Sequence, residues 1–77
     1  MDKESRRAIR KHARAWMIIH DLRILDIQRE LGMNNPVMIS ETFAGKKNNT
    51  AVLNLLREKG CPVEYLALPE RMIEGAV

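Results

Sequence analysis

The sequence predicts a small all-α protein, a compact bundle of about five short helices in one domain. Apolar residues recur with helical spacing between glycine, proline and asparagine breakers, and no segment alternates with the period of a strand. The only aromatic residues are Trp16, Phe43 and Tyr65, so the core must be aliphatic. A chain of 77 residues forms a single domain with a modest core. We expect residues 1–77 to form this domain, with its core at 5–68 and a flexible tail at 69–77.

The first predicted helix spans residues 3–20 and is amphipathic. At about 100° per residue, one face carries Ile9, Ala13, Trp16, Met17 and His20. The other face carries Lys3, Arg7, Arg10, Lys11 and Arg14. We expect the apolar face to pack on the bundle, with His20 in the core, and the basic face to lie in solvent.

Two short helices are predicted next. The first spans residues 24–31 and ends at Gly32, since glycine readily adopts the left-handed conformation that stops a helix. The second begins at Pro36, a residue suited to the first helical turn, and ends at Gly45. Either Asn34 or Asn35 is expected to cap its start.

The remaining helices are a segment at residues 50–59, capped by Asn48 or Asn49 and stopped by Gly60, and a single turn at 62–66. Helical spacing also predicts which side chains face inward. The expected core consists of Trp16, Ile27, Leu31, Ile39, Phe43, Val52 and Leu56.

Basic charge is concentrated at the start of the chain. Residues 1–14 hold six basic and two acidic side chains, whereas residues 15–77 hold seven basic and eight acidic ones. A basic face on one helix suggests a polyanionic partner. The alternative is a solvated helix face with no ligand.

No residues have the spacing of a catalytic or metal site. His12 and His20 lie eight positions apart, and no glycine-rich phosphate loop is present. The single cysteine, Cys61, cannot form a disulfide within the chain and is expected to be a buried small apolar residue. The longest apolar run has five residues, far short of the roughly 20 that a membrane span needs. We therefore expect a cytoplasmic protein that is no enzyme and uses no metal or cofactor.

Ordered apolar and glycine positions run from Leu22 to Leu66. They comprise IQRELGM at 27–33, ISETFAGK at 39–46 and GCPVEYL at 60–66. Together these segments resemble the lambda-repressor-like (Cro/C1-type) helix-turn-helix DNA-binding family over about residues 16–68. Within that family the chain is most similar to small phage regulators such as the Ner-like repressors of transposable phages.

The resemblance implies a recognition helix in the major groove of duplex DNA, with its N-terminus toward the bases. The base-facing candidates are Asn34, Asn35, Val37, Met38, Glu41 and Thr42, and we expect Asn35 to lie closer to DNA than Glu41. Phosphate candidates after this helix are Lys46, Lys47, Asn48 and Asn49; for the two asparagines, helix capping is the alternative. The resemblance does not explain the basic arc of Arg7, Arg10, Lys11 and Arg14, which we expect to extend the phosphate contacts or, alternatively, to maintain solubility.

Three features depart from the family pattern. Gln28 stands where the family has alanine, the turn around Asn34 and Asn35 is one residue longer, and the recognition helix holds no Arg, Asn or Gln. The alternative function is therefore a protein-interaction module that keeps the fold and presents Val37, Met38 and Glu41 to another protein.

The function expected from these observations is repressor-like regulation of transcription through duplex DNA, without a small-molecule substrate. Regulators of this type commonly act as two-fold dimers. We expect a homodimer whose small apolar interface is built from Leu66, Leu68, Met72 and Ile73.

Overall fold

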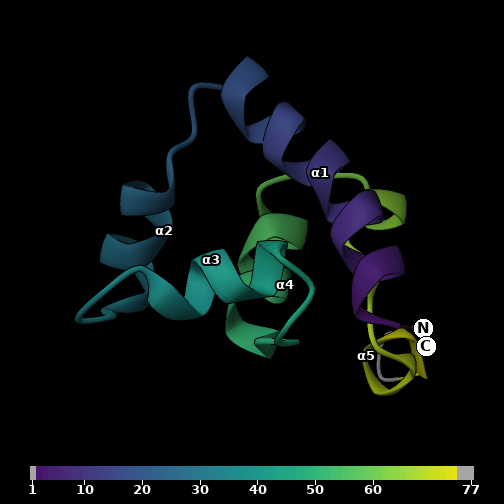
Figure 1. The fold of residues 1–77 in the computed structure, drawn as a ribbon. Coiled ribbons are helices and arrows are strands. Elements are labelled where there is room, and N and C mark those ends of the chain that lie inside the picture. Colours follow the sequence, from purple (N-terminus) through teal and green to yellow (C-terminus); the bar gives the residue numbers. More distant parts are fainter. Residues whose placement is uncertain (1, 75–77) are drawn as a thin grey trace.

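The fold described by the computed structural model, over residues 2–74, is entirely helical. Its elements in chain order are α1 (Lys3–Ile19), α2 (Ile24–Leu31), α3 (Val37–Phe43), α4 (Thr50–Glu58), the 3-10 turn η1 (Val63–Tyr65) and α5 (Glu70–Glu74). In Figure 1, α1 crosses above α3 and α4, α2 closes one side, and α5 lies beside the N-terminal end of α1. The expected all-α bundle is confirmed.

Capping side chains mark the starts of α1 and α4, and Gly32 marks the end of α2. Asp2 caps α1 by accepting a 2.8 Å hydrogen bond from the Ser5 amide, which lowers the pKa of its carboxyl. Gly32 ends α2 with φ +67°, and Asn49 caps α4 through a 3.2 Å bond from the Val52 amide. The N-cap position of α3 is Pro36 rather than Asn34 or Asn35, although Asn35 Oδ1 accepts a hydrogen bond from the amide of Val37, the first residue of the helix.

The core gathers apolar side chains from every helix. Of the expected members, Ile27, Ile39, Phe43, Val52 and Leu56 are buried, and Trp16 and Leu31 are half-buried against them. Cys61 is buried as expected, and burial raises the pKa of its thiol to about 11. The inward positions predicted from helical spacing are therefore confirmed.

The C-terminal segment departs from the expected flexible tail. Residues 70–74 form α5, and Met72 is only 8% exposed within the core. Leu66 is fully buried in the same core, so the predicted dimer surface of Leu66, Leu68, Met72 and Ile73 was wrong: only Ile73 is largely exposed. The core therefore extends beyond residue 68; residues 75–77 lie outside the described part of the chain.

Two polar side chains near α2 differ from a simple helical-wheel assignment. His20 is exposed rather than buried, and its ring lies 4.5 Å from that of Trp16. Gln28 folds over the turn that follows α2, where its side-chain amide donates to the Met33 carbonyl oxygen at 3.3 Å. The larger side chain therefore fits by bonding the turn. No described helix has the length and apolarity to span a bilayer.

Candidate nucleic-acid interface

The N-terminal half of α1 lies directly against the end of α3. Gly45, with φ +81°, follows α3 so closely that a Cβ atom there would overlap the Lys3 carbonyl oxygen and lie 2.9 Å from the Arg7 nitrogen. The Arg6 side chain donates to the Gly45 carbonyl oxygen at 3.0 Å. Glycine is required here by both the positive φ and the close approach of the two backbones.

Arg10 joins three segments of the chain beneath this contact. Its Nε donates to the Leu66 carbonyl oxygen at 2.8 Å. One terminal nitrogen donates to the carbonyl oxygens of Thr42 and Lys47, at 2.8 and 2.9 Å. The other donates to Asn48 Oδ1 at 2.7 Å and to the Ala67 carbonyl oxygen at 3.2 Å. All five N–H groups of the guanidinium are thereby bonded.

The expectation that Arg10 belongs to a solvent-facing basic arc was wrong, because the side chain is only 1% exposed. Burial lowers the pKa of Arg10 to about 10, and the neighbouring positive charge of Arg6 acts in the same direction. At neutral pH the group therefore remains charged. Its five partners are all neutral oxygens, so its positive charge is not cancelled by a carboxylate bonded to it.

Of the other residues in the basic arc, the Arg7 backbone and the Arg14 side chain lie near the end of α3. At about 100° per residue, Arg7, Lys11 and Arg14 follow Arg10 on one side of the helix. Gly45 approaches Arg7 on this side, and the Phe43 ring lies 5.6 Å from the Arg14 guanidinium. Arg7 and Lys11 are exposed, whereas Arg14 is half-buried.

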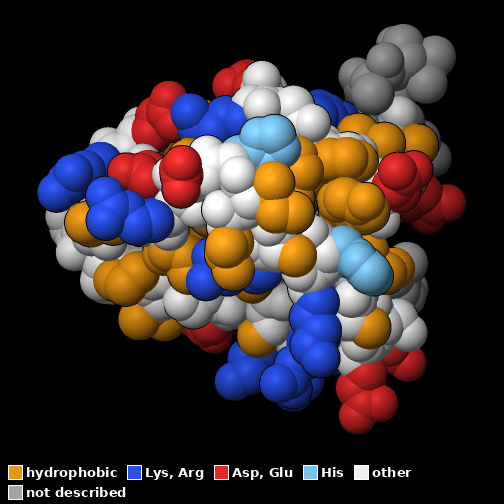
Figure 2. Space-filling view, turned by 90° about the horizontal axis from the view of Figure 1, so that it is seen from above, with side chains coloured by type: hydrophobic (Ala, Val, Ile, Leu, Met, Phe, Trp, Pro, Cys, Tyr) orange, Lys and Arg blue, Asp and Glu red, His pale blue; other side chains and the backbone are white. Residues whose placement is uncertain are grey.

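The loop after α3 adds two exposed lysines beside this side of α1. The backbone amides of Lys46 and Lys47 donate to the Glu41 carbonyl oxygen at 3.0 and 3.3 Å, and both residues are exposed. In Figure 2, Lys and Arg side chains form a distinct group at the lower edge of the molecule. We call Arg7, Lys11, Arg14, Lys46 and Lys47 the basic surface.

The two asparagines of the same loop have structural partners. Asn48 accepts from the buried Arg10, and Asn49 uses its oxygen to cap α4. Capping, the alternative stated for these residues, therefore accounts for Asn49. For Asn48 the partner is a guanidinium that fixes the loop.

The start of α3 presents most of the base-facing candidates. Asn34, Asn35, Val37 and Met38 are exposed, and Glu41 is half-buried. Asn35 also accepts a 3.0 Å hydrogen bond from the Val37 amide, which orders the entry to the helix. Thr42 was wrongly placed among these candidates: it is fully buried, and its hydroxyl donates to the Met38 carbonyl oxygen at 2.7 Å.

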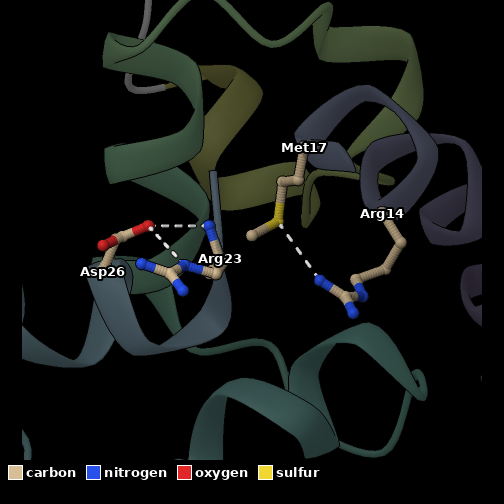
Figure 3. Close-up of polar contacts among 4 residues, drawn as sticks. All are labelled: Arg14, Met17, Arg23 and Asp26. Atoms are coloured by element: carbon tan, nitrogen blue, oxygen red, sulfur yellow. Dashed lines mark hydrogen bonds and ion pairs between the residues drawn. The ribbon is translucent and has the colours of Figure 1, made fainter. Parts of the chain in front are cut away.

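Sequence reasoning missed Arg23, which lies at the N-cap of α2. Its backbone amide donates to Asp26 Oδ2 at 2.8 Å, and its Nε lies 3.9 Å from the same oxygen. Figure 3 shows this pair facing Arg14 and Met17 of α1. Between them is an open groove of about 510 Å³, lined by Arg14, Ile18, Asp21, Leu22, Arg23 and Ile24. Spacing along the sequence offers no signal for this juxtaposition, because the conformation of the connecting loop creates it.

Within residues 2–74, no cluster of His, Cys, Asp or Glu could hold a metal ion. The polar features of the site are thus a basic surface, a row of exposed residues at the start of α3, and a groove with two arginines. Comparison with protein-family models, curated proteins and solved structures gives no match.

Proposed function

We propose that this protein is a DNA-binding regulator of transcription, with α2 and α3 acting as a helix-turn-helix on duplex DNA. The observation that carries the proposal is the position of the basic surface. Its members come from α1 and from the loop after α3, and the backbone of that loop is held against α1 at Gly45 and through the Arg10 bond to the Lys47 carbonyl oxygen. A polyanion following that side of the molecule would meet cations from both segments.

In this proposal, the basic surface contacts phosphates and the start of α3 faces the bases. Exposed lysine and arginine side chains supply the sequence-independent part of DNA affinity. Asn34 and Asn35 offer donors and acceptors to base edges, while Val37 and Met38 offer apolar contact to thymine methyl groups. Glu41 can accept a hydrogen bond from cytosine, but its half-buried position favours Asn35 as the closer residue.

Arg10 has a different role from the phosphate contact first expected of it. By bonding Thr42, Lys47 and Asn48, it fixes the loop that presents the two lysines. Ordering these side chains before binding reduces the entropy lost when DNA is bound. Its unneutralised charge also adds to the positive potential beneath the loop.

The proposal is tested by titrating the protein with a duplex of random sequence while following its backbone amide signals. We expect shifts at the start of α3, in the 45–49 loop and along the Arg7 side of α1, together with affinity that falls steeply as salt rises. Shifts confined to the opposite side of α1, near Trp16 and His20, would contradict this orientation. Absence of saturable binding at low salt would contradict DNA binding itself.

The second candidate is a protein-interaction module, favoured by the apolar character of α3. Val37 is 54% exposed and Met38 41% exposed, and α3 contains no arginine. Such a module would bind its partner mainly by burying apolar side chains, with little dependence on salt. The random duplex titration therefore separates the two functions.

A further inference from the structure

Arg10 and Arg14 lie one helical turn apart on α1 and have opposite surroundings. The five N–H groups of Arg10 bond to oxygen atoms, whereas the described contacts of the Arg14 guanidinium are the face of Phe43 and, at 3.9 Å, the thioether sulfur of Met17. A thioether is a weak acceptor. Arg14 is therefore a half-buried cation with no oxygen partner among the described residues.

The unmatched guanidinium lines the groove between α1 and the start of α2. This groove, of about 510 Å³, has the size of a small-molecule site. Ile18, Leu22 and Ile24 make part of its lining apolar, and Ile18 is 68% exposed. Arg23 lines it from the second element, so two arginines border a partly apolar surface (Figure 3).

We infer that this groove binds a small organic anion with an apolar body, whose carboxylate bonds Arg14 and whose hydrocarbon part covers Ile18 and Ile24. A carboxylate matches the planar donor fork of a guanidinium. The lining holds two guanidinium groups and one carboxylate, Asp21, and Arg23 also lies 3.9 Å from the Asp26 carboxylate. Arg14 is therefore the cation available to a ligand, and the groove favours a single negative charge over a doubly charged phosphate. A ligand without a hydrocarbon part would leave the apolar lining in water.

Such a ligand also competes with DNA at Arg14, a consequence that rests on the proposed function. Arg14 belongs to the basic surface, and a carboxylate bonded to its guanidinium withdraws that group from phosphate. The groove would then couple the concentration of an organic acid to the affinity for duplex DNA through mutual exclusion.

The test uses octanoate as the probe, below the concentration at which it forms micelles, and follows the amide signals of the whole protein. We expect saturable shifts at Arg14, Ile18 and residues 22–24, with affinity of about millimolar strength. Octanol, which lacks the charge, and inorganic phosphate, which lacks the hydrocarbon body, should both bind at least about tenfold more weakly. Equal binding of octanol and octanoate would contradict a role for the arginines.

Variants assign the binding to Arg14. Arg14→Gln should weaken octanoate binding by about tenfold or more, whereas Lys11→Gln, which removes an exposed charge from the same helix outside the groove, should leave it unchanged. Ile18→Ser alters an exposed residue, so the protein should fold and bind octanoate severalfold more weakly. Equal losses in the Arg14 and Lys11 variants, or no loss in either, would overturn the site.

A duplex titration with and without saturating octanoate completes the experiment. Weaker duplex binding in octanoate by the native protein, but not by Arg14→Gln, supports competition at Arg14. Octanoate binding that leaves duplex affinity unchanged overturns the competition. Octanoate binding in a protein that binds no duplex overturns the proposed function while the groove site stands.

Discussion

The Arg10 guanidinium donates to the Thr42 carbonyl oxygen at 2.8 Å, which links the middle of α1 to the end of α3 in the interior of the protein. Both residues are polar and both are buried. Thr42 accepts through its backbone oxygen, while its hydroxyl donates to the Met38 carbonyl oxygen. This contact explains why the loop after α3 is held against the basic helix.

Replacing Arg10 with methionine tests this internal link. Methionine fills much of the same space but leaves the oxygens of Thr42, Lys47 and Leu66 without their donor, so we expect the free energy of unfolding to fall by about 3 kcal/mol. Urea denaturation measures the change. Lys11→Met, at the adjacent exposed position, should alter it by no more than about 0.5 kcal/mol. Equal effects in the two variants would mean that the buried hydrogen bonds contribute nothing net.

Alanine substitutions at Gly45 and Gly32 can be compared to test how closely α1 approaches the end of α3. Both have positive φ, +81° and +67°, but a Cβ atom at Gly32 meets open space whereas one at Gly45 overlaps the α1 backbone. Gly32→Ala should cost about 1–2 kcal/mol from the left-handed conformation alone. Gly45→Ala should cost clearly more, because α1 must also move away. Thermal unfolding of the two variants in parallel measures these losses of stability. Equal losses in Gly32→Ala and Gly45→Ala would contradict the close contact between Gly45 and α1.

Phe43 is the largest apolar side chain that α3 contributes to the core. The Phe43 side chain is only 8% exposed. Phe43→Ala should therefore lower the free energy of unfolding by about 3–5 kcal/mol, which is close to the whole stability of a marginal domain. Val37→Ala, on the exposed face of the same helix, should have little effect. A dispersed amide spectrum and near-native stability for the Phe43 variant would contradict its place in the core.

The helices and most of the core could be predicted because they depend on local patterns. Apolar spacing located Ile27, Ile39 and Val52 on inward faces, and Gly32 marked the end of α2. The tail was less predictable. The apolar residues of 69–77 come only as the pairs Met72-Ile73 and Ala76-Val77, too few to show a helical period, yet Met72 reaches the core because Pro69 and α5 return the chain to the bundle.

The candidate site was only partly predictable, since burial of a polar group depends on its distant partners. A helical wheel places Arg10 with Arg7 and Lys11, and a charged side chain is expected in solvent by default. Its acceptors come from residues 42, 47, 48, 66 and 67, which only the tertiary fold assembles. The pairing of Arg14 with Arg23 across a groove likewise depends on the loop between α1 and α2.

The two lysines after α3 should act on all DNA sequences alike. Lys46→Ala and Lys47→Ala should each weaken duplex binding and reduce the slope of log affinity against log salt by about one unit. Filter or fluorescence titrations at several salt concentrations give this slope. Lys59→Ala is the control, since that residue borders the Trp16 and His20 side of α1 and pairs with Glu30. Unchanged slopes in both loop variants would remove these lysines from the interface.

The salt dependence of duplex binding by the triple variant of Arg7, Lys46 and Lys47, each changed to Gln, tests the shared basic surface most directly. The matched control changes Arg57, Lys59 and Arg71 to Gln and so removes the same net charge from α4, its C-cap and α5. If α1 and the loop after α3 contact phosphates together, the first variant should lose about three units of slope while the control retains the native value. If both triple variants lost the same number of units from the slope of log affinity against log salt, only the net charge of the protein would matter, and the proposed surface would be contradicted.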